Sequence, residues 1–279
     1  MSDSEAEHKA RKERIADLYH RVASVYGQVG PNYFAYAGRH LVEHTGVTES
    51  AQVLDVATGR GANLFAAAEV VGPQGMAMGV DLALGMVRET AVEIERRKLS
   101  QAAIRQMDAE HLVFSDASFD YVLCGFAIFF FPHLERALAE FLRVLRPGGR
   151  LGITVAQDLA SFSRWYGEHL TAYHQRYHIP LGVGVGKGGD YAALPEYLTL
   201  AGFVGVQVIQ EQAEFIYADA QEWWDSRWTH GPRYSLEQMT PQVLAQFKAE
   251  VLARLSQDAR PDGIHETMRF QYIIAGKKG

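Results

Sequence analysis

The segment from Val53 to Asn63 constrains the fold of this chain more than any other part of the sequence. It reads Val-Leu-Asp-Val-Ala-Thr-Gly-Arg-Gly-Ala-Asn and predicts a buried strand, a glycine turn and the start of a helix. Glycine lets the backbone turn tightly and lets a ligand approach it closely. Unpaired N–H groups at the start of the helix attract a carboxylate or a phosphate. The segment therefore predicts a binding site for a small, charged, nucleotide-like cofactor.

Acidic residues stand at the ends of three successive predicted strands. Asp55 lies in the first strand, Asp81 ends the strand that begins at Met76, and Asp108 follows the strand 102–107. Ligands of open α/β sheets bind at the carboxyl ends of the strands, so these three carboxylates are expected to form one site. A carboxylate in the place of Asp81 can accept hydrogen bonds from both hydroxyls of a ribose.

Strands and helices alternate through the middle of the chain. Strands are predicted over residues 52–56, 76–81, 102–107, 120–126 and 150–155, and helices over 61–71, 84–98 and 133–145. A Pro147-Gly148-Gly149 turn is expected before the last strand. Such alternation predicts a parallel sheet with right-handed crossovers. Two earlier helices, from about Lys12 to Val29 and from Tyr33 to Thr45, are predicted from apolar residues at helical spacing.

A dinucleotide-binding fold is the first alternative. Its fingerprint is G-x-G-x-x-G, but Leu64 stands where the third glycine belongs. Asp55, which lies in the strand before the turn, is also foreign to that fingerprint. A nicotinamide-dependent oxidoreductase therefore remains an alternative that would have to bind its cofactor without this glycine.

The ordered motifs resemble those of the class I S-adenosylmethionine-dependent methyltransferases. The resemblance rests on Asp55 to Gly61, Gly79-Val80-Asp81, Met107-Asp108-Ala109, Phe119 to Phe126, and Leu142 to Arg150. It covers about residues 20–155, and within the superfamily the chain is most similar to the ubiquinone/menaquinone-type small-molecule methyltransferases. It departs from the family pattern at Ala57-Thr58, where many relatives have Gly-Cys or Gly-Thr.

The resemblance implies a fold, a reaction and a cofactor. The fold is a Rossmann-like α/β fold with a seven-stranded, mostly parallel sheet and helices on both faces, completed by strands 204–210 and 269–275, the last one antiparallel. The reaction is in-line transfer of a methyl group from S-adenosyl-L-methionine to a small molecule of biosynthesis or secondary metabolism. A methyltransferase-fold protein with a non-methylating role, such as cyclisation, is the second alternative.

The resemblance also implies roles for single residues. Asp55 would anchor the glycine turn near the amino group of the methionine part, Asp81 would accept from the ribose hydroxyls, and Asp108 from the adenine amino group. The plainer alternatives are a strand-end cap, the N-terminal cap of helix 84–98, and a surface acid. The cofactor-binding residues expected on these grounds are Tyr26, Tyr33, Asp55, Ala57, Thr58, Gly59, Gly61, Asn63, Asp81, Leu82, Met86, Asp108, Ala109, Gly125 and Phe126.

The remainder of the chain is interpreted as a cap and a lid. Residues 1–46 form an N-terminal helical cap and residues 47–279 the methyltransferase domain. Helical segments at about 159–192 and 217–260, which include a glycine-rich loop at 182–189, are interpreted as a lid or substrate wall too discontinuous to bury a core of its own. Four aromatic residues are candidates for lining a pocket for a prenyl-, polyketide- or quinone-like acceptor: Phe129, Trp165, Tyr173 and Trp224. The alternative is that the tail aromatics seal the lid against the sheet.

The sequence does not single out a catalytic group. Tyr26 and His174 are the candidates, and Tyr26 is equally well explained as a helix-packing tyrosine that closes no site. His174 and His178 have the i, i+4 spacing of metal ligands, but the sequence places no third ligand, so no metal site is expected.

Charge and composition limit the partners. The formal net charge of −6 argues against a nucleic-acid partner, and the basic run from His8 to Arg14 is interpreted as a solvated helix face. The acidic first residues do not form a signal peptide, and no apolar run reaches the about 20 residues that span a bilayer. A cytoplasmic protein without stable membrane insertion is expected. A homo-oligomer that exchanges the N-terminal helix is left open.

Overall fold

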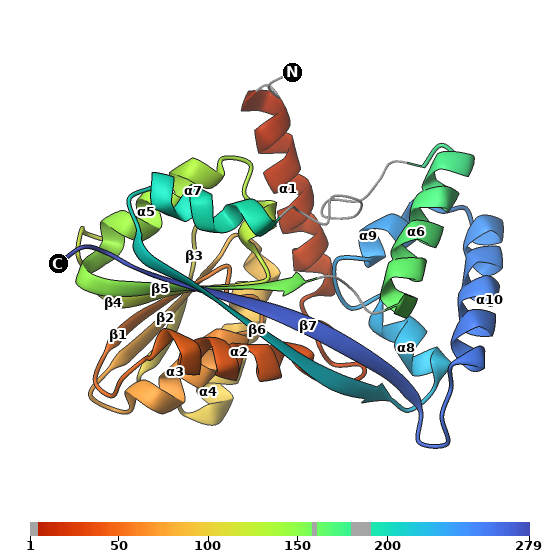
Figure 1. Cartoon of the computed structure of the whole chain (residues 1–279), viewed down its shortest axis with the longest axis horizontal. Coiled ribbons are helices and arrows are strands. Elements are labelled where there is room, and N and C mark those ends of the chain that lie inside the picture. The colour runs from red at the N-terminus through yellow and green to blue at the C-terminus, as the bar shows by residue number, and fades with distance from the viewer. Residues whose placement is uncertain (1–4, 158–160, 180–190) are drawn as a thin grey trace.

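One seven-stranded sheet organises the molecule (Figure 1). The computed structural model describes residues 5–157, 161–179 and 191–279, so the predicted loop 182–189 lies outside the described residues. The strand order is β3-β2-β1-β4-β5-β7-β6. The strands are β1 (Gln52–Val56), β2 (Met76–Asp81), β3 (Ala102–Gln106), β4 (Phe119–Gly125), β5 (Leu145–Gln157), β6 (Val204–Tyr217) and β7 (Ile264–Gly276). Neighbours among β1–β5 pair in parallel and β7 runs antiparallel to both β5 and β6, which confirms the predicted fold class.

Helices cover both faces of the sheet (Figure 1). One face carries α2 (Tyr33–Thr45), α3 (Ala62–Val71) and α4 (Leu84–Arg97), and the other carries α5 (Leu134–Val144) and α7 (Leu194–Leu200). Each face has its own buried apolar cluster, one around Leu41 and Leu64 and the other around Phe141 and Leu198. The sequence analysis missed α7, a single short helix with only Leu194 and Leu198 buried. Two 3-10 turns, η1 (Ile128–Phe130) and η2 (Tyr191–Ala193), complete this part.

The first helix, α1 (Glu5–Val22), differs from the prediction at both ends. It begins before Lys12 and ends at Val22, and a hydrogen-bonded turn follows in which the N–H groups of Val25 and Tyr26 both donate to the Val22 carbonyl. Leu18 and Val22 pack against the first turn of α4. In Figure 1 the helix stands between the sheet and the helices α6 (Ser161–Arg176), α8 (Ala220–Ser226), α9 (Arg233–Glu237) and α10 (Pro241–Gln257).

Three strands are longer than predicted. β5 already pairs with Phe119 at Leu145, and the predicted Pro147-Gly148-Gly149 turn is a bulge inside this strand, with φ +78° at Gly148. β6 and β7 pair from Val204–Gly276 to Tyr217–Ile264. Their far ends extend beyond the rest of the sheet (Figure 1). The alternating pattern used to predict short strands could not reveal this extension.

The predicted lid helices are present as α6 (Ser161–Arg176), α8 (Ala220–Ser226), α9 (Arg233–Glu237) and α10 (Pro241–Gln257). They surround a buried cluster that includes Leu170, Trp223 and Phe247 and is separate from the two sheet clusters. Because Tyr217 of β6 and Ile264 of β7 belong to this cluster, the helices do not bury it by themselves. We call the cluster the lid core, and the role of these segments as a lid stays a prediction. Large aromatic side chains supply much apolar area from few residues, and Tyr217 and Ile264 at the strand ends add to it.

Candidate active site

Asp55 holds the glycine turn from inside. Its side chain is fully buried and accepts hydrogen bonds from the Thr58 hydroxyl and from the Asn63 amide, whose nitrogen is 2.9 Å away. Burial raises the pKa of Asp55 to about 7, although these hydrogen bonds favour the charged form. The turn is thus anchored by the residue that the motif predicted, and by two partners that belong to the same motif.

The turn forces Ala57 into the left-handed region, at φ +54°. This conformation costs an L-residue about 1–2 kcal/mol. Replacing alanine with glycine lowers the free energy of unfolding by about 0.4–1 kcal/mol, because glycine gives the unfolded chain more conformational entropy. We expect Ala57→Gly to raise the free energy of unfolding by up to about 1 kcal/mol. Urea unfolding measures this, with Ala249→Gly in the exposed interior of α10 as the control that loses about 1 kcal/mol. Equal losses in the two variants would contradict strain at Ala57.

Asp81 ends β2 and ties the turn to the next loop. Its Oδ2 accepts from the Gly59 N–H and its Oδ1 from the Ala83 N–H, both at 2.8 Å. Ala83, not Asp81, is the N-cap of α4, which excludes the capping alternative. Burial raises the pKa of Asp81 to about 6. Each carboxylate oxygen has a second lone pair, and the residue lines the main cavity, so both oxygens remain able to accept from a ligand.

Asp108 forms an ion pair that the sequence analysis did not foresee. Lys12 Nζ of α1 lies 2.8 Å from Asp108 Oδ2 and 2.6 Å from Glu110 Oε2. The Lys12 side chain is only 19% exposed, so the basic run of α1 is not wholly a solvated face as interpreted. Helical spacing could have indicated that Lys12 faces the site, because Lys12, Ile15 and Tyr19 share one side of α1 and all line the main cavity.

We call the cavity that Asp81 and Asp108 line the main cavity, and it lies at the carboxyl ends of β1 to β4. Ten expected cofactor residues line it: Tyr26, Ala57, Gly59, Asp81, Leu82, Met86, Asp108, Ala109, Gly125 and Phe126. Phe130, Phe131 and Pro132 also line it, and the Phe130 ring meets that of Tyr19 on α1 at 5.5 Å.

A second, more polar cavity adjoins the first around the glycine turn. It shares Tyr26, Ala57, Gly59, Gly125 and Phe126 with the main cavity. It adds three further expected residues, Thr58, Gly61 and Asn63. The joined cavities thus have two different ends. One is mostly apolar but carries the carboxylates of Asp81 and Asp108, and the other, at the start of α3, is lined by the glycine turn. Asp55 and Tyr33 are not among the residues that line these two cavities.

Aromatic side chains form a wall beside the shared part of the cavities. Tyr26 stacks on Phe34 with ring centroids 4.8 Å apart, and Phe34 meets Phe126 edge-on at 5.7 Å. Phe126 itself is held at φ +53°, a conformation that is strained for a bulky residue and that concentrates at functional sites. We call Tyr26, Tyr33, Phe34, Phe126 and His230 the aromatic wall.

His230 is the polar member of the aromatic wall. Its Nε2 lies 3.4 Å from the Tyr33 hydroxyl, and its ring meets the edge of Phe34 at 6.1 Å. Burial, with the Arg227 guanidinium nearby, lowers the pKa of His230 to about 3, so the imidazole is neutral near pH 7. No sequence signal separated His230 from the other ten histidines of the chain.

The structure places the expected substrate residues elsewhere. Trp165, Tyr173 and Trp224 belong to the lid core or pack on it, and Phe129 packs on the core on the α5 side of the sheet. None of these four lines either cavity described above. The alternative, that the tail aromatics seal the lid, fits this arrangement. Phe130 and Phe131, rather than Phe129, line the main cavity.

His174 is likewise remote from the cavities. It is buried in α6, and its Nδ1 lies 3.1 Å from the Ile179 carbonyl. His178 is exposed at φ +52°, beyond the end of α6, so the helical spacing that would pair it with His174 is lost. Neither residue lines either of the two cavities, and the role of His174 as a catalytic group stays a prediction.

Comparisons with known proteins decide the family. A family profile described as a methyltransferase domain matches residues 53–149. Nocamycin O-methyltransferase of Saccharothrix syringae is 32% identical over 270 residues, which cover 92% of this chain and 96% of that protein. The chain belongs to the class I S-adenosylmethionine-dependent methyltransferases. Its cofactor is S-adenosylmethionine, and it transfers a methyl group to a small molecule.

Two further proteins are similar to this chain, one over part of its sequence and one in fold alone. The ubiquinone/menaquinone biosynthesis C-methyltransferase UbiE of Ectopseudomonas mendocina is 33% identical over 153 residues, which cover 50% of this chain and 57% of that protein. Phosphoethanolamine N-methyltransferase 2 of Haemonchus contortus, solved with S-adenosyl-L-methionine, has a similar fold, with a TM-score of 0.54, 17% identity and coverage of 95% of this chain and 57% of that one. The oxidoreductase and cyclisation alternatives are not favoured. Among the described residues, no helix is both long enough and apolar enough to cross a bilayer.

Proposed function

We propose that the joined cavities bind S-adenosylmethionine with its adenosine part at Asp81 and Asp108 and its methionine part at the glycine turn. The observation that carries this proposal is the carboxylate of Asp81, which faces a cavity that also contains Asp108 and the turn. Asp81 would accept from the ribose hydroxyls and Asp108 from the adenine amino group beside its pair with Lys12. Tyr26 would close over the cofactor where the two cavities meet.

The acceptor in this proposal is a small aromatic molecule of polyketide or quinone type, held against the aromatic wall. Aromatic faces bind planar apolar rings well, and the wall adjoins the shared part of the cavities, where the methyl group would lie. The names of two relatives, which refer to nocamycin and to ubiquinone and menaquinone, support this class. The cap of residues 1–46 and lid segments at about 159–192 and 217–260 would exclude water from the acceptor.

Methylation of an acidic hydroxyl fits the chemistry of the wall best. The sulfonium already carries the leaving group, so the protein mainly has to align the acceptor, the methyl carbon and the sulfur. His230, with a pKa of about 3, is too weak a base to deprotonate an ordinary alcohol near neutral pH. A phenol or enol that ionises readily needs less help, and the neutral imidazole with the Tyr33 hydroxyl would orient it.

A panel of acceptors tests this function. The purified enzyme is incubated with S-adenosylmethionine and a hydroxylated aromatic polyketide, a naphthoquinol or, as a polar control, phosphoethanolamine. Mass spectrometry then measures products that have gained one methyl group. Methylation of the aromatic hydroxyls with none of the control supports the proposal, whereas methylation of the amine alone refutes the proposed acceptor class.

Binding of S-adenosylhomocysteine, the form of the cofactor that remains after methyl transfer, should weaken below about pH 6. The raised pKa of Asp81 means that its carboxyl is protonated below about pH 6 in the free enzyme and ionised above it. Only the ionised form offers lone pairs to both ribose hydroxyls, so the affinity for S-adenosylhomocysteine should fall by up to about tenfold per pH unit below that pKa. Calorimetric titrations between about pH 5 and pH 8 measure this against Asp81→Asn, which cannot titrate. Identical profiles for the two proteins would contradict the role of Asp81.

A further inference from the structure

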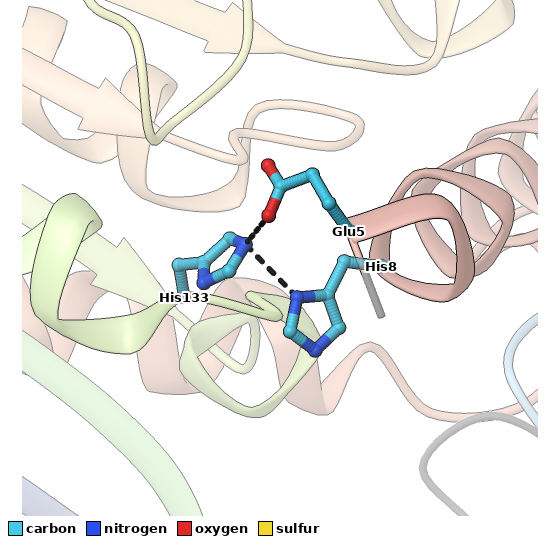
Figure 2. Close-up of side chains that lie close together, drawn as sticks. All are labelled: Glu5, His8 and His133. Atoms are coloured by element: carbon cyan, nitrogen blue, oxygen red, sulfur yellow. Dashed lines mark hydrogen bonds and ion pairs between the residues drawn. The ribbon is translucent and has the colours of Figure 1, made fainter. Parts of the chain in front are cut away.

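Three side chains with metal-ligand atoms converge where α1 begins (Figure 2). Glu5 and His8 come from the first turns of α1, and His133 immediately precedes α5. His8 Nδ1 lies 2.9 Å from His133 Nε2, and Glu5 Oε2 lies 3.1 Å from the same nitrogen. Ligand atoms on a tetrahedral zinc ion, with bonds of about 2.0–2.1 Å, stand about 3.3 Å apart. The two distances to His133 Nε2 are within about 0.4 Å of that spacing, and all three ligand atoms lie within 4.8 Å of one another.

The tautomer of His133 decides whether a proton lies between its Nε2 and the Glu5 carboxylate. Glu135 Oε1 lies 3.6 Å from His133 Nδ1, which favours the tautomer with the proton on Nδ1 and a lone pair on Nε2. In that tautomer the lone pairs of His133 Nε2 and Glu5 Oε2 face each other at 3.1 Å. In the other tautomer the single Nε2 proton is shared between the Glu5 carboxylate and His8. A divalent cation accepts electron pairs from all three atoms at once.

A second cluster, His40, His44 and Glu211, shows the contrast. His40 Nδ1 meets Glu211 Oε2 at 2.8 Å, and His44 Nε2 meets Glu211 Oε1 at 2.7 Å. Each imidazole thus faces its own carboxylate oxygen, although among the described residues only His44 Nε2 has the geometry of a hydrogen bond to Glu211. His44→Ala in this second cluster therefore serves as the comparison for the first.

We propose that Glu5, His8 and His133 bind a divalent transition-metal ion, with zinc as the reference ion and water in the fourth position. Two neighbours already orient the ligands. Arg136 Nη1 holds Glu5 Oε1 at 3.3 Å, so Oε2 is left toward His133 (Figure 2). The backbone N–H of His133 donates to Glu110 Oε1 at 3.0 Å. Two imidazoles with one carboxylate are a donor set that zinc accepts in proteins.

The ion would fix α1 to the segment before α5. Lys12 of α1 and Pro132, next to His133, both line the main cavity. Glu110 links the same two parts, since it pairs with Lys12 and accepts from the His133 N–H. The site is therefore structural and lies behind the wall of the cofactor cavity, and its existence does not depend on the identity of the acceptor.

Zinc binding to the full chain without a polyhistidine tag tests the site. After treatment with a chelator, calorimetric titration with zinc chloride should show one ion bound per chain. His8→Ala and His133→Ala should each lose this binding, and His44→Ala should keep it, while binding of S-adenosylhomocysteine reports that each variant is folded. Absence of stoichiometric zinc in the unaltered chain, or loss of zinc in His44→Ala alone, would overturn the proposal.

Two milder measurements keep the test decisive if His133→Ala does not fold. Glu135→Gln removes only the carboxylate behind the ligand and should weaken zinc binding by about tenfold. Cobalt(II) in place of zinc should give the visible absorption of a four-coordinate ion in the unaltered chain. That absorption should disappear in His8→Ala and Glu5→Gln, and its persistence in both would contradict the assigned ligands.

Discussion

Replacing Asp81 with alanine should weaken binding of S-adenosylhomocysteine by roughly 100-fold. The carboxylate is placed to accept from both ribose hydroxyls, and hydrogen bonds to a charged group contribute about 1.5–3 kcal/mol each. Loss of about 3 kcal/mol corresponds to roughly two powers of ten in Kd. The substitution also leaves the N–H groups of Gly59 and Ala83 without their acceptor. Calorimetric titration of the purified variant measures the change.

Two comparisons make the Asp81 result specific. Asp258→Ala removes an exposed carboxylate at the end of α10, remote from the cavities, and should leave the affinity unchanged. Asp81→Asn keeps the size of the side chain but presents an NH₂ group to one of its N–H partners, so it should fall close to the alanine variant. An affinity within about threefold of the unaltered enzyme in Asp81→Ala would remove Asp81 from the ribose site.

Trp223→Ala should lower the free energy of unfolding by about 3–5 kcal/mol while leaving cofactor affinity unchanged. Trp223 is fully buried in the lid core, where its Nε1 donates to Glu266 Oε2 at 3.2 Å and the Arg227 guanidinium lies 4.2 Å from its ring centre. It lines neither of the two cavities. A drop of this size would lower Tm by about 10 °C in a chain of this length. Urea unfolding and calorimetric titration of the same sample measure both quantities.

Trp223→Phe separates packing from the hydrogen bond. It keeps most of the ring volume and loses only the donor to Glu266, so it should cost about 1–2 kcal/mol. The opposite pattern in Trp223→Ala, normal stability with lost cofactor affinity, would mean that the tail aromatics line the ligand site after all. The present arrangement, in which Tyr166 and Phe247 surround Trp223, argues against that pattern.

The motif residues could be assigned to the site before the fold was known because the chemistry there is local. Asp55, Thr58 and Asn63 lie within nine residues, and their hydrogen bonds form inside one strand-turn-helix unit. Asp81 and Asp108 were predicted to lie near Asp55, since parallel strands bring their carboxyl ends to one edge of the sheet. The same reasoning could not give the length of β6 and β7, because their extension is stabilised only by pairing with each other.

The aromatic residues show where sequence reasoning failed. Trp165, Tyr173 and Trp224 have the composition of an apolar pocket, but the same composition fills a core, and only packing distinguishes the two. Lys12 and His230 were missed for a related reason. Lys12 meets Asp108 across 96 residues, and His230 meets Tyr33 across 197.

The order of strands and helices, the glycine turn with its aspartates and the family membership all follow from patterns within short stretches of sequence, where periodicity and turn chemistry act. The wall of the cavity, the neutral state of His230, the lid core and the Glu5–His8–His133 cluster depend on residues far apart in the chain. Their contacts arise only when helices pack on the sheet, since burial and distance set their charge and partners. For this protein, local sequence therefore specifies the glycine turn and its aspartates, and the tertiary structure decides what surrounds them.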